Sequence, residues 1–374
     1  MHLEALHTIL REGAGSVAPA IQVVVRHRGG VIVDGAYGWL DPETRGSPVT
    51  RASLFDMASV TKLFVVTTFM MLVEAGKLAV DQAVSTVLPE FLGTRPIQPY
   101  EDPLGGAGWV ELADGGTVDA GAITFRNLLT HTSGLPAWRP LYRQESAAAA
   151  RAMALTTFFS CPTGTRVVYS DIGLILLGIA IERTTGQRLD VAARERVTDP
   201  LCLRHTCYLP VDAQDPYPAE VAPTEFCRWR NRRIVGVVHD ENAHRLNGVA
   251  GHAGIFSTAR DVATFGQCYL EGGGDLLSPE TVREMRRLQT AGLDTPRGLG
   301  FALWSQDPEA SGNPFSRSGF GHTGFTGTSL WVDPERDLVV ALMTNEVYNG
   351  RTDRRIGPFR VAVHRAVVEA VDRL

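Results

Sequence analysis

Hydrophobic residues recur along the chain with two spacings, and each spacing predicts a different kind of element. Residues 20–26 and 31–36 are β-rich and flank an Arg-Gly-Gly turn at 28–30, a pattern typical of a β-hairpin. Residues 3–12 and 355–374 carry apolar side chains at helical spacing, with polar residues between them. The two ends of the chain therefore predict amphipathic helices, and the hairpin follows the first of them.

Longer apolar segments inside the chain predict buried helices. Residues 63–76 are apolar on most sides, and residues 172–185 form a second apolar segment that stops at Gly186, a residue typical of helix ends. Further helices are expected at residues 146–155, 258–270 and 278–290. The last part of the chain returns to β pattern, with strands expected at 299–304, 319–332 and 338–343.

This order of elements predicts an α+β fold in which an antiparallel sheet is built from both chain termini and flanked by helices, with a mostly helical insertion. We expect one sheet-containing lobe at residues 1–80 and 245–374, a helical and loop-rich lobe at 81–244, and an active site between them. Loops 93–121 and 205–240 are rich in polar, glycine or proline residues, and loops of this length usually shape a site.

Composition narrows the possible partners. The 374 residues are 44% hydrophobic and 21% charged, as in ordinary globular proteins, and the net charge of -5 provides no basic surface for nucleic acid. The longest apolar run, residues 172–181, is too short to span a bilayer. We therefore expect neither nucleic acid nor membrane as a partner.

Cysteine usage favours a reducing compartment. The five cysteines are odd in number and lack paired spacing, so reduced thiols in a cytoplasmic protein are the simplest interpretation. The N-terminus has no basic region followed by an apolar core, although a chain whose signal peptide has been removed shows the same pattern.

Ser59 and Lys62 form the candidate catalytic pair. They are three residues apart at the start of the apolar helix, so both side chains lie on one face of its first turn, and Asp56 just upstream is a candidate cap. A serine hydroxyl needs a neighbour to take its proton, and a lysine does so if partial burial lowers its pKa. Alone, the spacing is common, and a solvated serine and lysine would satisfy it.

Other candidate residues are histidines and acids. His131 precedes a Gly-Leu-Pro turn, where a capping or core role is favoured over that of ligand or base. The segment 239–244 and His252 bring histidines and acids close in sequence, but there is no His-Glu-x-x-His and no cysteine pair, so we expect no metal. No dinucleotide fingerprint or phosphate loop appears, so we expect no cofactor.

Three motifs in chain order carry a resemblance: Ser59-Val60-Thr61-Lys62, Tyr169-Ser170-Asp171 and His322-Thr323-Gly324. Together they resemble the Ser-x-x-Lys, Tyr-x-Asn and Lys-Thr-Gly elements of the serine penicillin-recognising enzymes, particularly class C β-lactamases, D-peptidases and family VIII esterases. The similarity extends over nearly the whole chain. It implies a β-lactamase-like fold and a serine hydrolase that needs no cofactor and acts on a small-molecule ester, amide or peptide.

The resemblance also implies roles for these residues. Ser59 would attack an acyl carbon to give an acyl-enzyme, Lys62 would accept or relay its proton, and Tyr169 would shuttle a proton toward the leaving group. The Thr323-Gly324 strand would border the substrate, and the N–H groups of Ser59 and Phe325 would form the oxyanion hole. A buried tyrosine that caps a backbone group is the alternative for Tyr169.

Two departures from the family pattern bear on the substrate. His322 replaces a lysine that holds a substrate carboxylate, so carboxylate recognition is expected to be weakened. Asp171 replaces an asparagine, and an ionised carboxylate only accepts hydrogen bonds, which suits a substrate N–H, hydroxyl or ammonium. Both changes argue against efficient β-lactam hydrolysis.

The segments around His239 and His252 also resemble a subgroup that removes the peptide from N-acetylmuramic acid. Asp240, Glu241 and His252 would then contact a polar sugar or peptide, or alternatively anchor a loop. We expect cleavage of an ester or amide through an acyl-enzyme. The alternatives are a muramyl-peptide amidase or D-amino-acid peptidase, and a catalytically silent binder of peptidoglycan fragments.

Overall fold

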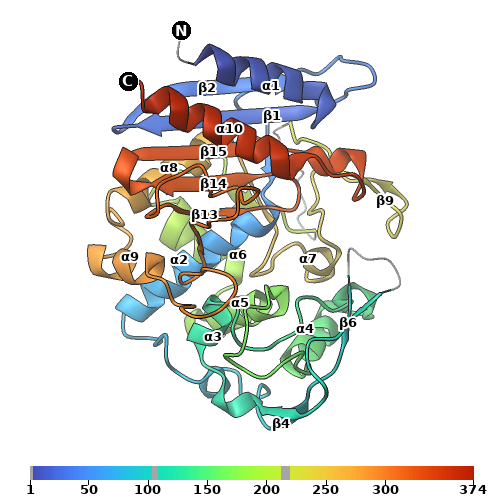
Figure 1. The fold of residues 1–374 in the computed structure, drawn as a ribbon. Coiled ribbons are helices and arrows are strands. Elements are labelled where there is room, and N and C mark those ends of the chain that lie inside the picture. The colour runs from blue at the N-terminus through green and yellow to red at the C-terminus, as the bar shows by residue number, and fades with distance from the viewer. Residues whose placement is uncertain (1–2, 103–107, 212–219) are drawn as a thin grey trace.

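A computed structural model describes residues 3–102, 108–211 and 220–374. Within these residues the largest sheet is antiparallel and has six strands in the order β12-β13-β14-β15-β1-β2 (Figure 1). The first two strands come from the start of the chain and the other four from its end, as the sequence predicts. Their bounds are β1 Ala20–His27, β2 Gly30–Gly38, β12 Ala302–Leu303, β13 Phe320–Thr323, β14 Ser329–Asp333 and β15 Leu338–Thr344.

The central strands are buried on both faces. In β1, Ile21, Val23 and Val25 face one hydrophobic cluster, while Val24 faces another. β15 pairs with β1 in antiparallel register, with Val24 opposite Ala341, and divides its side chains between the same two clusters. Period-two alternation thus supplies apolar residues to both sides of the sheet, which must be covered on each.

Helices cover both faces. Helices α1 (Glu4–Ser16) and α10 (Ile356–Val371), from opposite ends of the chain, pack together over one face (Figure 1). Helix α8 (Ala259–Leu270) lies on the other face against β1, β14 and β15. Helix α2 (Thr61–Glu74) contacts α5 (Asp171–Thr185), and both are buried over most of their length, which explains their continuous apolar sequences.

The remaining elements are shorter. A small sheet, in the order β3-β11-β8, joins Phe55–Asp56, Ile255–Ser257 and Cys207–Tyr208. The other helices are α3 Phe125–Leu129, α4 Ala147–Leu155, α6 Leu189–Ala193, α7 Glu241–Arg245 and α9 Pro279–Arg286. The predicted loops contain three strand pairs: β4 Thr94–Pro96 with β7 Thr117–Asp119, β5 Tyr100–Glu101 with β6 Trp109–Val110, and β9 Phe226–Cys227 with β10 Arg232–Arg233.

The structure differs from expectation at one strand. Of the segment expected at 299–304, only Ala302–Leu303 forms strand. The residues before it bond elsewhere, because the Leu299 N–H donates to Met285 and Gly300, at φ +79°, donates to Leu129. The middles of both long predicted loops, 103–107 and 212–219, lie outside the described residues. The division into two lobes stays a prediction.

None of the helices in the described residues combines the length and the apolar composition needed to cross a membrane.

Candidate active site

Ser59 lies in a tight turn that is held by hydrogen bonds to Asp56 and continues directly into α2. The turn is a 3₁₀ helix, Ala58–Val60, directly before α2, and Ala58 has φ +45°, an uncommon value for a residue with a side chain. Asp56 accepts hydrogen bonds from the N–H groups of Ala58 (2.8 Å) and His239 (2.6 Å). Asp56 therefore caps this turn and not α2 itself, whose first residue is Thr61.

Lys62 links the nucleophile to the rest of the site. Its Nζ donates to Ser59 Oγ at 2.7 Å and to the His252 carbonyl at 3.2 Å, and it forms an ion pair with Asp171 Oδ1 at 2.8 Å. Burial alone would lower the pKa of Lys62, but the charge of Asp171 and the contact with Tyr169 outweigh it and raise the pKa above its usual 10.5. This direction is opposite to expectation: the resting lysine is an ammonium.

Tyr169 is held just before α5 by its neighbours. The Ser170 side chain caps α5, and the backbone N–H of Ser170 donates to His131 Nδ1 at 3.0 Å. The His131 ring centroid lies 4.6 Å from that of Tyr169, and Lys62 Nζ lies 4.8 Å from the Tyr169 ring centroid. His131 is therefore a buried positioning residue, whose pKa is held well below 6.5 by burial and by nearby cations.

Strand β13 brings the third motif beside Tyr169. The His322 ring lies 5.9 Å from the Tyr169 ring, and His322 Nδ1 donates to the Thr323 carbonyl at 2.8 Å. Burial and the charges of Lys62 and Arg297 keep the pKa of His322 well below 6.5. His322 is thus neutral, and its Nε2 is a buried acceptor without a partner among the described residues.

Gly324 and Phe325 form the turn that faces Ser59. A side chain at 324 would collide with Thr328 Oγ1 (2.1 Å) and with the Met57 carbonyl (2.4 Å), so only glycine fits. The Gly324 N–H donates to Thr328, and the N–H of Phe325 follows it. Arg360, from α10, donates to the carbonyls of Gly324 (2.6 Å) and Thr328 (2.9 Å), which fixes this turn.

Acidic residues at and around α7 form a further wall of the site, and each has a partner. Asp240 caps α7 through the Ala243 N–H (2.7 Å) and bonds His252 Nε2 (2.8 Å). Burial opposes ionisation of Asp240, but His252 and the capping bond hold its pKa below the usual range. The other two pairs on this wall are Glu241 with Arg351 (2.6 Å) and His239 with Glu225 (2.8 Å).

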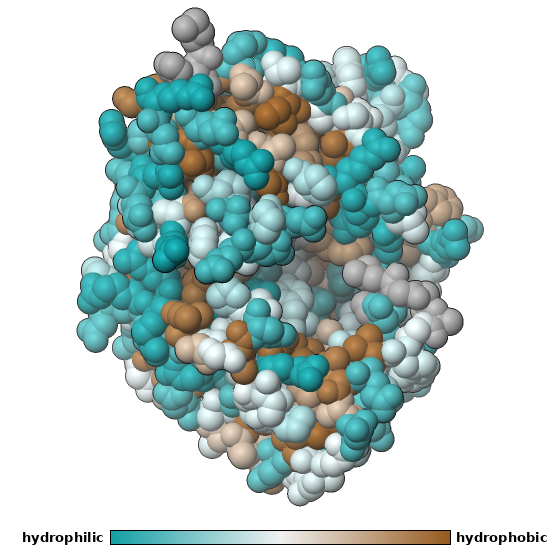
Figure 2. Space-filling model, in the orientation of Figure 1, coloured by the Kyte–Doolittle hydropathy of each residue, from teal (hydrophilic) through white to brown (hydrophobic). Residues whose placement is uncertain are grey.

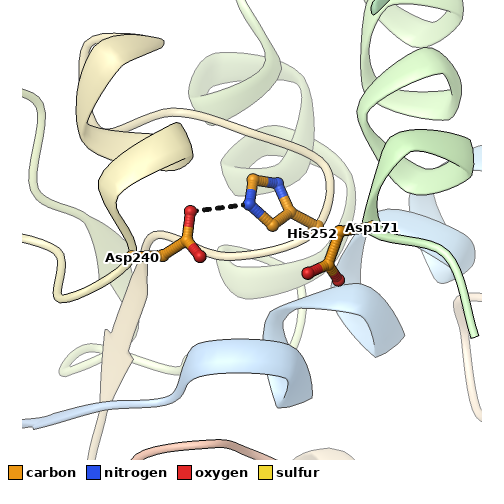
Figure 3. Close-up of side chains that lie close together, drawn as sticks. All are labelled: Asp171, Asp240 and His252. Atoms are coloured by element: carbon orange, nitrogen blue, oxygen red, sulfur yellow. Dashed lines mark hydrogen bonds and ion pairs between the residues drawn. The ribbon is translucent and has the colours of Figure 1, made fainter. Parts of the chain in front are cut away.

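Asp171, Asp240 and His252 are the candidate metal ligands in the described part of the chain. One ligand atom from each lies within 4.8 Å of the others, and Figure 3 shows Asp240 and His252 turned toward each other with Asp171 beside them. The Lys62 ammonium already neutralises Asp171, and a divalent ion there would lie next to it. His239 and Glu241 are engaged elsewhere, so the metal cluster considered from the sequence does not form as a group.

The motifs meet at a cavity of about 970 Å³. Figure 2, which has the orientation of Figure 1, shows a hollow near the middle of the face that is drawn. Lys62 is buried behind Ser59. All the other predicted site residues line the cavity: Ser59, Tyr169, Asp171, Asp240, Glu241, His252, His322, Thr323, Gly324 and Phe325.

Sequence reasoning missed several residues of the cavity. Arg297, Arg351 and Arg354 line it, as do Trp138 and Tyr142. Arg297 stands in a Pro-Arg-Gly segment next to a predicted strand, and no spacing or motif marks it. Only a signal for contact between distant segments would have found these residues.

Comparisons with known proteins identify a family and relatives for this chain. The family model described as Beta-lactamase matches residues 7–364. The N-acetylmuramyl-L-alanine amidase of Bacillus subtilis (strain 168) is 33% identical over 388 aligned positions, which cover 94% of this chain and 82% of that protein. Simvastatin synthase (LovD) from Aspergillus terreus has the same fold, with a TM-score of 0.74 at 21% identity and 98% coverage of both chains. EstCE1, a hydrolase with promiscuous acyltransferase activity, gives a TM-score of 0.70 at 21% identity, also covering 98% of both chains.

Fold, motif order and relatives together define a serine hydrolase that cleaves an ester or amide bond through an acyl-enzyme. The chain belongs to the β-lactamase family, as the resemblance of its three motifs implies.

Proposed function

We propose that this hydrolase is an amidase that releases a peptide or amino acid from a sugar-peptide such as N-acetylmuramyl-L-alanine. The observation that carries the proposal is the polar character of the cavity, which is lined by Asp171, Asp240, Glu241, His322 and several arginines. A sugar-peptide offers hydroxyl and amide groups to such walls, whereas a simple apolar ester does not. The amidase from Bacillus subtilis, similar over nearly the whole chain, supports this choice.

The proposed chemistry assigns a step to each central residue. Ser59 Oγ forms a bond to the carbonyl carbon while its proton passes to Lys62. Because Lys62 is an ammonium at rest, it acts as a relay and gives up one of its own protons toward Tyr169 and the leaving amine. The N–H groups of Ser59 and Phe325 hold the oxyanion. The C–N bond then breaks, and water later hydrolyses the Ser59 ester.

Ester hydrolysis is the second candidate. His322 and Asp171 replace the lysine and asparagine of the family motifs, and the structure leaves His322 neutral. A site that lacks the family lysine and asparagine does not require the carboxylate-bearing peptide that those two residues bind. Short-chain esters are therefore the comparison substrates.

The test combines labelling of the nucleophile with product analysis. Wild type and Ser59→Ala are incubated with a fluorophosphonate and measured by intact-protein mass, and L-alanine release from N-acetylmuramyl-L-alanine is compared with hydrolysis of p-nitrophenyl acetate. We expect one adduct and L-alanine release in wild type, and neither in Ser59→Ala, with an unchanged unfolding midpoint because a turn serine contributes little to stability.

Each other outcome has a meaning. L-Alanine release by a clean Ser59→Ala preparation would refute the mechanism. An adduct with ester hydrolysis but no L-alanine release would favour the esterase. A folded wild type that forms no adduct would favour the silent binder of peptidoglycan fragments.

We also propose a cytoplasmic location, which suits the recycling of small sugar-peptides. Three of the five cysteines, Cys161, Cys227 and Cys268, are free thiols that are buried in the structure. Reduced thiols are typical of that compartment. Reaction of the five thiols with a maleimide in freshly isolated protein tests this location.

A further inference from the structure

Among the arginines of the cavity, Arg297 is distinguished by being partly buried while its side chain has no hydrogen-bond or ion-pair partner among the described residues. Three of these arginines bind carboxylates: Arg143 with Glu101, Arg351 with Glu225 and Glu241, and Arg354 with Glu346. Arg360 is engaged with two carbonyl groups, and Arg166 is exposed to water. Arg297 is partly buried, and its side chain forms no hydrogen bond or ion pair with the residues that the structure describes.

The position of Arg297 is well defined by its backbone. Its N–H donates to Thr290 Oγ1 at 2.9 Å, and its carbonyl accepts from the Gln289 N–H at 2.8 Å. The guanidinium carbon lies 5.2 Å from the centroid of the Tyr169 ring, inside the cavity that contains Ser59. Its Nε is buried without a partner. The side chain therefore rests on the aromatic face with its donors unused.

An unpaired guanidinium in a partly buried site is costly unless a ligand completes it. Position 322 is where the family motif has a lysine, and this chain has a neutral histidine there. Arg297 acts electrostatically on His322 and on His131, so it brings a positive charge to this same side of the cavity from a different segment. The expectation that carboxylate recognition is weakened therefore overlooks this cation.

We propose that Arg297 binds a carboxylate of the substrate, on the leaving-group side of the bond that is cleaved. The assignment to that side rests on the proposed function, in which Tyr169 delivers a proton to the leaving group, because Arg297 lies against Tyr169. A planar guanidinium matches a carboxylate with two parallel hydrogen bonds. A dianionic phosphate suits the site less well, because Asp171 and Asp294 also line the cavity.

Two esters with the same acyl group provide a test that does not require a sugar. They are 3-carboxyphenyl acetate and 3-carbamoylphenyl acetate, whose leaving groups differ in charge, and each rate is divided by that of hydroxide-catalysed hydrolysis. We expect wild type to prefer the carboxylate by about ten- to a hundredfold in kcat/KM. Arg297→Gln should lose this preference through KM, and Arg297→Lys should keep part of it.

Arg166→Gln is the matched control, because it removes an exposed positive charge from the same cavity. It should keep the wild-type preference. An equal loss for both esters in Arg297→Gln would overturn the proposal, because the residue would then act through Tyr169 or the fold. A wild type without preference, or an unchanged preference in Arg297→Gln, would overturn it as well.

A binding measurement keeps the proposal separate from turnover. Calorimetry with folded Ser59→Ala compares 3-acetamidobenzoate with 3-acetamidobenzamide, with and without Arg297→Gln. We expect binding that requires both the carboxylate and Arg297. Such binding without any L-alanine release in wild type would support the anion site while refuting the amidase, whereas no carboxylate-dependent binding would overturn the anion site.

Discussion

The two walls of the cavity differ in whether their polar side chains have partners within the protein. The paired wall consists of His239, Asp240, Glu241 and His252, and each of these side chains has a charged or hydrogen-bonding partner within the protein. Among the described residues, only the Nδ1 atom of His252 is buried without a partner on this wall. The open wall consists of Tyr169, Arg297 and His322, and it holds a guanidinium and a buried imidazole nitrogen without partners among the described residues. The side chains of the paired wall are therefore held by bonds within the protein, and we infer that a ligand supplies partners for those of the open wall.

This difference follows from the cost of burying polar atoms. A buried donor or acceptor left unsatisfied costs about 1–3 kcal/mol, so most such atoms in native proteins have a partner. Exceptions that line the cavity beside Ser59 are therefore informative. They indicate where the substrate supplies the missing partners. The number of charged residues alone does not indicate this position.

The largest expected effect comes from breaking the paired wall. Asp240→Ala removes the cap of α7 and leaves His252 without its carboxylate, so we expect a loss of about 2–4 kcal/mol in the free energy of unfolding. Urea denaturation measures this change. Arg297→Gln should change the free energy of unfolding by less than about 0.5 kcal/mol, as expected for a side chain without hydrogen-bond or ion-pair partners among the described residues.

If Asp240→Ala were as stable as wild type and only slowed turnover, the paired wall would be a substrate-binding surface. A strongly destabilised Arg297→Gln would mean that the open wall also supports the fold. Either result would remove the contrast between the two walls.

A second prediction concerns Asp171, which joins the two walls through Lys62. Asp171→Asn restores the family residue and removes the charge that raises the pKa of Lys62, so this pKa should fall. Because the proposed relay requires the ammonium, the alkaline limb of the pH profile for kcat should move to lower pH. Wild type should lose activity only above the ordinary lysine value of 10.5.

The pH profile also distinguishes two mechanisms. If neutral Lys62 were the base, the variant would instead show its acid limb displaced to lower pH, with higher activity near neutrality. Asp171→Glu, which keeps the charge, is the control and should retain a profile closer to that of wild type.

The smallest expected effect concerns His322. His322→Lys restores the family lysine, but Lys62 and Arg297 already place positive charge nearby and Arg297 already serves the carboxylate. We expect at most about a threefold lower KM for 3-carboxyphenyl acetate. A gain larger than the loss in Arg297→Gln would move the anion site to position 322.

Local sequence signals predict much of the fold. The hairpin, the buried helices and the sheet built from both ends follow from periodicity and turn residues, and the order of three short motifs identifies Ser59, Lys62 and Tyr169 as one group. Predictions failed where the outcome depends on distant neighbours. The charge of Lys62 depends on Asp171. The start of strand β12 depends on the bonds that the preceding residues form with Leu129 and Met285.

The site on the open wall was harder to predict for the same reason. Arg297 enters the cavity from a segment with no recognisable motif, and its importance lies in the partner that it lacks. A sequence records which residues are charged but not which of them are paired. Spatial neighbours must be known before an unpaired cation can be recognised.

The pairing of β1 with β15 also has a consequence for folding. These adjacent central strands are separated by most of the chain, and β13 with the Gly324 turn belongs to the same C-terminal part of the sheet. Contacts between such distant segments form slowly, because a large loop must close first. Ser59 therefore meets the Gly324-Phe325 turn only after the last strands have docked, and recovery of activity during refolding should lag behind formation of the helices.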